Sequence, residues 1–157
     1  MKNKTQQLLT YIIQNHKNVP ITSLMKLSYI VDLVSMKKRN NKISDFDYKR
    51  YKYGPFDDKI YRHLTVLRVK DFITEDVAYT WGEDDYIIYK VNNKKEFSFD
   101  KLNTEEKEII NEVIEAFKGY GAKSLTKFTY KTKPMKKLGA KVGNNKGLNQ
   151  KLDLSLA

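Results

Sequence analysis

The stretch YKYGPFDDKIY, residues 51–61, places an aromatic segment directly before a Gly-Pro pair and two aspartates. Gly54 permits a positive φ and a close approach of the backbone, and Pro55 fixes its own φ. The aspartates can begin a helix, whose apolar stripe runs nearly to Lys70. The stretch therefore predicts a helix that leaves an aromatic strand at a set angle.

The residues before this stretch predict two helices and the aromatic strand. Apolar side chains recur with helical spacing over 5–16 and over about 22–37, with Thr22 as the N-cap of the second helix. Aromatic and charged residues then alternate over 45–53, with a slip of one position after Tyr48. This pattern indicates a strand with a bend or bulge, which the Gly-Pro pair is expected to break.

The residues after the stretch predict a β-hairpin. Two β-rich runs, 73–81 and 86–91, flank the acidic turn Gly82-Glu83-Asp84-Asp85. A short run over 96–99 is expected to add an edge strand.

Further helices and a tail complete the predicted fold. Asn103 and Glu106 have the spacing of a capping box before an apolar stripe, and 124–130 predict a short helix. Residues 1–135 are thus expected to form a single α+β domain, mainly helical, with a small antiparallel sheet that includes the hairpin. Residues 136–157 are expected to form a basic, weakly ordered tail, although their leucines could dock.

The composition excludes several kinds of site and favours one ordinary domain. The chain has 157 residues, of which 40% are hydrophobic and 31% charged, as expected for one ordinary domain. It has no cysteine, which excludes disulfides, thiolate catalysis and cysteine metal sites, and favours a cytoplasmic location. No apolar run approaches the length of a transmembrane helix, so no membrane partner is expected.

The net charge of +11 is unevenly distributed. Residues 1–70 carry 15 basic and 5 acidic side chains, 71–117 carry 5 and 13, and 118–157 carry 10 and 1. This alternation is typical of a protein that binds an acidic partner surface or nucleic acid, or of one whose charges pair within the molecule. A basic, solvated surface without a specific partner is equally consistent with it.

The sequence offers little to catalysis. The two histidines, His16 and His63, belong to no metal-binding or nucleophile-activating spacing. We therefore expect the protein not to be an enzyme, and to hold no metal and no cofactor.

A winged-helix module that binds nucleic acid is the alternative. Helices followed by a hairpin in a basic protein favour it. The acidic turn over 82–85 would repel phosphates, however, and the strand between the second and third helices removes the tight turn of a helix-turn-helix. At most weak, non-specific binding of nucleic acid is expected, through the basic tail.

Three segments together resemble one family. Leu24 to Asp32, LMKLSYIVD, resembles the K-L-L-Y-x-A-D helix of the Panacea domain, the SocA-like antitoxin family, which also includes the phage-associated GepA proteins. Residues 51–61 resemble the aromatic-x-x-G-P-x-x-x-x-x-Tyr signature of that family, and this match is the more specific. Residues 125–134, LTKFTYKTKP, lie where the family has L-S-x-x-T-H-x-x-x-P-W. The resemblance covers about residues 5–135.

The resemblance implies a mostly helical fold with a small sheet, and a function in a toxin-antitoxin system. It implies a cytoplasmic antitoxin that neutralises a cognate toxin by direct protein contact, without catalysis. Some members of the family are suspected of handing the toxin to a protease as adaptors. Tyr130 stands where the family usually has His, and Met135 where it has Trp, so the partner or the geometry can differ here.

The candidate partner-binding residues come from two of these segments. The aromatic residues are good interface anchors at a low entropic cost, although a purely scaffolding role is the preferred interpretation of the Gly-Pro segment. The lysines offer a landing patch for an acidic surface, although any solvated surface also tolerates them. The candidates are Tyr51, Tyr53, Gly54, Pro55, Phe56, Tyr61, Lys127, Tyr130 and Lys131.

Overall fold

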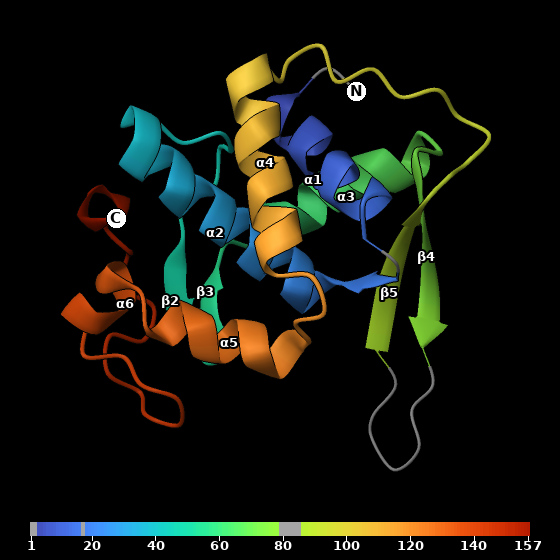
Figure 1. The fold of residues 1–157 in the computed structure, drawn as a ribbon. Coiled ribbons are helices and arrows are strands. Elements are labelled where there is room, and N and C mark those ends of the chain that lie inside the picture. Colours follow the sequence, from blue (N-terminus) through green and yellow to red (C-terminus); the bar gives the residue numbers. More distant parts are fainter. Residues whose placement is uncertain (1–2, 17, 79–85) are drawn as a thin grey trace.

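The computed structural model describes residues 3–16, 18–78 and 86–157 (Figure 1). The acidic turn Gly82-Glu83-Asp84-Asp85 and the end of the predicted strand, residues 79–81, lie outside the described residues. No helix in the described part of the chain is long and apolar enough to cross a membrane.

The described residues form a mainly helical α+β fold, as the sequence predicts. The α-helices are α1 Lys4–Gln14, α2 Ile21–Arg39, α3 Lys59–Val69, α4 Thr104–Ala116, α5 Ala122–Tyr130 and α6 Lys133–Lys137, and a 3₁₀-helix, η1, covers Leu154–Leu156. The strands are β1 Val19–Pro20, β2 Lys49–Tyr51, β3 Gly54–Phe56, β4 Ile73–Ala78 and β5 Tyr86–Val91. They form an antiparallel sheet with the order β1-β5-β4, and a separate antiparallel pair, β2-β3. The predicted pairing of β4 with β5 is thus confirmed over the described residues.

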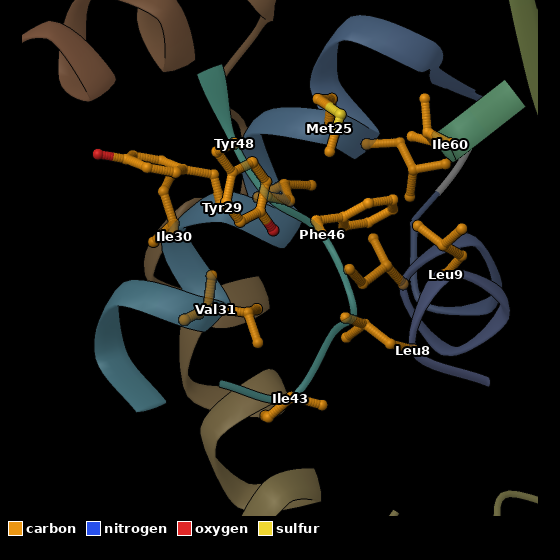
Figure 2. Close-up of a cluster of buried hydrophobic side chains, with 14 of the residues drawn as sticks. Leu8, Leu9, Met25, Tyr29, Ile30, Val31, Ile43, Phe46, Tyr48 and Ile60 are labelled. Atoms are coloured by element: carbon orange, nitrogen blue, oxygen red, sulfur yellow. The ribbon is translucent and has the colours of Figure 1, made fainter. Parts of the chain in front are cut away.

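Helix α2 is the centre of the core. Its residues 23–32 are all buried, as expected for a helix covered on every side, and α1, α4 and α5 pack against it. Figure 2 shows Ile43 and Phe46, from the connection between α2 and β2, among the side chains of α1 and α2. Figure 1 shows β4 and β5 at one side of the helices and β2 and β3 at the other.

A local sequence signal determines where α4 begins, whereas long-range strand pairing determines where α2 begins. The capping box is confirmed, because Asn103 Oδ1 accepts from the Glu106 N–H at 2.8 Å and Glu106 Oε1 accepts from the Asn103 N–H at 3.0 Å. The prediction of Thr22 as the N-cap of α2 is wrong. Pro20 occupies that position without a side-chain cap, because it pairs with Ile88 in the sheet and the helix begins directly after it.

The aromatic strand is shorter than predicted, and the Gly-Pro pair does not break it. β3 contains Gly54 and Pro55 and turns back onto β2, with Arg50 opposite Pro55. Pro55 is tolerated because no ladder hydrogen bond of this short strand pair needs the N–H that proline lacks. Residues 45–48 form no strand. The segment before them is held instead by the buried Asp32 carboxylate, which accepts from the Ile43 N–H at 2.8 Å.

The predicted edge strand over 96–99 is also wrong. The third position of the sheet is taken by β1, whose Val19 lies opposite Tyr89 of β5. Phe97 and Phe99 stack on one another with ring centroids 6.1 Å apart, and Phe99 meets Tyr11 of α1 edge-on at 5.1 Å. This segment therefore contributes aromatic packing in place of a backbone ladder.

The last segment of the chain packs against β2. The Arg50 N–H donates to the carbonyl of Gln150 at 2.9 Å, and the Leu152 N–H donates to the carbonyl of Tyr48 at 2.9 Å. Leu152 and Leu154 are buried, so these two leucines dock on the fold. The division of the chain at residue 135 stays a prediction.

Candidate functional site

The three segments that carry the resemblance meet at the β2-β3 hairpin. Gly54 has a φ of +116°, and a Cβ at this position would lie 3.2 Å from Thr129 Oγ1 and 3.6 Å from Lys26 Cε. Positive φ favours glycine, and the contacts leave little room for a side chain. Residues of α2 and α5 thus enclose the Gly-Pro turn, and glycine lets the three segments come this close.

The buried Tyr130 supports this hairpin from the interior of the fold. It is 7% exposed, and its hydroxyl donates to the carbonyl of Lys52 at 3.1 Å. Burial raises the pKa of this hydroxyl, so it remains protonated and able to donate at neutral pH. The structure therefore places Tyr130 as a positioning residue under the turn Lys52-Tyr53, away from the surface.

Arg50 holds the other side of the hairpin and was not among the candidates from the sequence. Its side chain is fully buried, and its guanidinium lies over the Tyr130 ring at 5.3 Å from the centroid. Its Nη2 donates to the carbonyl of Asn144 at 2.7 Å. Within the described residues its Nε and Nη1 have no hydrogen-bond partner. Arg50 thus joins β2, α5 and the last segment of the chain.

Four rings of the candidate set form one surface, called here the aromatic patch: Tyr51, Tyr53, Phe56 and Tyr61. Tyr53 and Tyr61 are 66% and 55% exposed, Tyr51 is 40% exposed, and Phe56 is half-buried. The ring centroids of Tyr51 and Phe56 are 5.1 Å apart, and those of Phe56 and Tyr61 are 5.8 Å apart. The patch surrounds a hollow of about 380 Å³, which Lys26 and Asp58 also line.

A second hollow, of about 420 Å³, lies between the hairpin turn and the start of α5. Tyr53, Lys26 and Thr22 line both hollows, so the Tyr53 ring stands at their common border. Lys127 and Val142 line the second hollow. The structure therefore brings Lys127 to the aromatic patch, as the candidate set requires.

Lys131 does not join them. It lines a different hollow, of about 310 Å³, together with Lys37, Phe128 and Pro134. Lys127 and Lys131 are one helical turn apart and both exposed, but they open onto different hollows. The candidate set thus divides into the aromatic patch with Lys127, the buried supports Gly54, Pro55 and Tyr130, and Lys131 elsewhere.

The polar residues of the LMKLSYIVD segment differ in what they contact. The Tyr29 hydroxyl hydrogen-bonds with Thr132 Oγ1 at 2.8 Å, and Asp32 Oδ2 accepts from the Tyr48 hydroxyl at 2.7 Å. Both residues thereby join distant parts of the fold. Lys26 is 4% exposed, and within the described ranges it makes no hydrogen bond and no ion pair. Its Nζ is not among the fully buried polar atoms that lack a partner, because Lys26 lines both hollows.

The two histidines differ in their contacts within the described residues, and His16 Nδ1 has no hydrogen-bond partner there. His63 is buried, and its Nε2 lies 3.1 Å from Asp45 Oδ1. Its Nδ1 lies 3.4 Å from Gln6 Nε2. His16 lies beyond the end of α1, beside Glu115 and Lys118 of another hollow.

The comparison with known families shows which family the chain belongs to. A family model described as "Antitoxin SocA-like, Panacea domain" matches residues 24–134. The chain belongs to the SocA-like antitoxin family. The matched range of this Panacea domain contains all three segments that meet at the hairpin, and the family supports an antitoxin-type role, which suggests a non-enzymatic protein. Among curated proteins and among solved structures there is no match.

Two residues of this Panacea-domain site were missed from the sequence for different reasons. Lys26 has a signal, because a lysine stands among apolar residues in a helix that is buried over residues 23–32. Arg50 has none, because its burial depends on the return of residues 138–157 to β2.

Proposed function

We propose that this protein neutralises a cognate toxin by direct, non-catalytic binding, and that the aromatic patch with Lys127 is the contact surface. One observation carries the proposal: the exposed rings gather where the three family segments meet. Buried residues of those segments hold the hairpin, while Tyr51, Tyr53 and Tyr61 present their rings to solvent.

The aromatic patch has the physical properties of a binding surface. Tyrosine offers a large contact area with only two side-chain torsions to immobilise, and it is frequent among residues that dominate interfaces. The Tyr130 hydrogen bond and the enclosed Gly54 fix the turn before any partner arrives. A fixed turn lowers the entropic cost of association.

The charge near the patch favours an acidic partner surface. Lys127 and Lys123 line the hollow beside Tyr53, and Lys52 lines the hollow of the patch. Exposed charges of this kind act mainly on the association rate and on its dependence on salt. We propose that they guide an acidic face of the toxin toward the rings in the cytoplasm.

Alanine variants test the contact surface. The toxin is first identified as the product of an adjacent short open reading frame that stops growth when expressed alone. Tyr53→Ala and Tyr61→Ala are each expected to weaken its binding at least about tenfold, as for anchor residues. Tyr86→Ala is the matched control, because Tyr86 is 42% exposed on β5, outside the patch.

The experiment also separates occlusion from delivery to a protease. Binding and toxin activity are measured with purified proteins, in the absence of any protease. Inhibition under these conditions supports neutralisation by occlusion, whereas binding without inhibition indicates an adaptor. Unchanged binding by both patch variants would contradict the proposed contact surface.

A further inference from the structure

The fold covers nearly all of the Lys26 side chain, and its ammonium group has no counter-ion among the described residues. Its residue is 4% exposed, in the buried stretch of α2, and its Cε lies 3.6 Å from the position of a Gly54 Cβ. Lys26 Nζ is not among the fully buried polar atoms that lack a partner, so the ammonium group reaches the hollows that Lys26 lines. A charge that is covered this far loses much of its hydration, and a carboxylate is its usual counter-ion. Within the described residues no such partner contacts Lys26.

The surroundings of Lys26 open toward solvent on both sides of Tyr53. Lys26 lines both the hollow of the aromatic patch and the hollow toward α5. The charged groups around these hollows are Asp58 at the start of α3, Lys52 of the turn, and Lys123 and Lys127 of α5. Asp58 is the acidic residue among them, and it forms no ion pair with Lys26.

We infer that Lys26 binds one carboxylate of the toxin, from an aspartate or glutamate side chain that enters beside Tyr53. The inference rests on the proposed function. It adds the ammonium group of Lys26 to the aromatic patch as a charged part of the contact surface. The Tyr53 ring stands beside the entry, and an inserted carboxylate would supply the counter-ion that the free protein lacks.

The same groups argue against a nucleic-acid backbone as the ligand. Asp58 lines the patch hollow and would repel a run of phosphates. A single carboxylate also matches a single buried ammonium, and such a pair gains strength where water is excluded.

The electrostatics of Lys26 give the inference a distinctive signature. Burial lowers the pKa of Lys26 to about 8, so part of its charge is lost in mildly alkaline solution. A carboxylate that binds the ammonium raises this pKa again. Toxin affinity is therefore full below about pH 8 and falls as the pH rises through 8, up to about tenfold for each pH unit.

Lys26→Met tests the inference, because it keeps the length of the side chain and removes the charge. We expect the thermal midpoint to stay or rise, since an unpaired buried charge is lost. Toxin affinity at pH 7 should fall at least about tenfold, and the decline of affinity between pH 7.5 and 9 should disappear, about the range where Lys26 titrates. Lys123→Met, in the same hollow, is the matched control and should keep the decline.

The outcomes separate this inference from the proposed function. A lower thermal midpoint without loss of toxin binding would assign Lys26 a structural role and overturn the inference. Unchanged toxin binding together with loss of binding to single-stranded DNA would overturn it in favour of nucleic acid. If Tyr53→Ala weakens binding and Lys26→Met does not, the inference fails alone. If neither variant weakens binding, the contact surface itself is wrong.

Discussion

The Tyr130 hydroxyl donates a hydrogen bond to the backbone carbonyl of Lys52 at 3.1 Å and thereby ties the end of α5 to the hairpin turn. Tyr130 stands where the family usually has His. At this position the side chain does not reach the surface, so the departure from the family pattern changes the support of the turn and leaves the exposed rings themselves in place. Its effect on partner binding is expected to pass through Tyr53.

Tyr130→Phe tests this support. The ring remains and the hydrogen bond is lost, so we expect the free energy of unfolding to fall by about 0.5–1.5 kcal/mol. Amide hydrogen exchange at Lys52 and Tyr53 should become faster, because the turn loses its anchor. Denaturant titration and exchange of the full chain measure both effects. Unchanged exchange at the turn would show that the hydrogen bond does not hold it.

Gly54→Ala is expected to act on stability first and on neutralisation only as a consequence. A φ of +116° is unfavourable for alanine, and the new Cβ would lie 3.2 Å from Thr129 Oγ1. The two effects together should cost about 1–3 kcal/mol of unfolding free energy. Gly143→Ala is the control, because Gly143 has a φ of +88° and nothing within 4 Å of its Cβ position. Equal losses in the two variants would show that enclosure by Thr129 is unimportant.

The structure changes the expected behaviour of Lys127 of α5 and of Lys131, which caps the same helix. Lys127→Glu should weaken neutralisation and reduce its decline with salt, because Lys127 lines the hollow beside Tyr53 and the variant loses an attraction that salt would screen. Lys131→Glu is its matched control, since Lys131 is exposed at the C-cap of the same helix but lines another hollow. Both melting curves should stay nearly unchanged. Toxin co-purification at physiological salt measures the difference, and equal retention by the two variants would remove Lys127 from the contact surface.

The predictable parts of this fold are those that local signals determine. The capping box of Asn103 and Glu106 and the apolar stripe of α4 lie within a few residues of each other, and so they were readable from the sequence. The strand β3 was not, because it pairs with β2 across a turn that the distant Tyr130 holds through the carbonyl of Lys52.

The same distinction applies to the candidate site. The aromatic residues of the hairpin were readable because exposed rings beside a Gly-Pro turn form a local pattern. The burial of Tyr130 and the isolation of Lys26 follow from helices packing across long separations in sequence, which no local pattern reports. Lys127 and Lys131 line different hollows because of the tertiary structure, since residues from other elements than α5 complete the walls of both hollows.

Nucleic-acid binding is expected to remain weak and independent of sequence, and to fall steeply with salt. Removal of residues 136–157 is a poor test of it, because it deletes the buried Leu152 and Leu154 and should destabilise the fold. Lys141→Gln with Lys146→Gln is a cleaner change, since both side chains are exposed. The double variant should bind a DNA duplex more weakly in electrophoretic shift assays. Tight, sequence-selective binding at physiological salt would favour the winged-helix alternative.

Acid stability should depend on Glu106, which joins three helices. Its side chain is buried, its Oε2 lies 2.7 Å from Lys4 Nζ of α1 and 3.3 Å from Arg39 Nη1 of α2, and its other oxygen completes the cap of α4. Burial alone would raise the pKa of Glu106, but the hydrogen bonds from Lys4 and from the Asn103 N–H, with the charges of Lys4 and Arg39, bring it below its ordinary value of 4.5. A lowered folded pKa gives stability that is present above pH 4.5 and is lost as the pH falls through the folded pKa.

Glu106→Gln separates the charge from the cap, because glutamine can still accept the hydrogen bond from the Asn103 N–H. At pH 7 the variant should lose about 1–3 kcal/mol of unfolding free energy, since the ammonium of Lys4 and the guanidinium of Arg39 lose their common carboxylate. Between pH 5 and 3 its stability should fall less steeply than that of the natural chain, because one carboxylate with a lowered pKa is gone. Glu105→Gln is the control, as the Glu105 side chain is 62% exposed and only 4.0 Å from Arg39 Nε at its closest. Urea titrations at several pH values measure both slopes, and identical acid limbs for the Glu106 variant and the natural chain would show that the buried carboxylate is not what the acid removes.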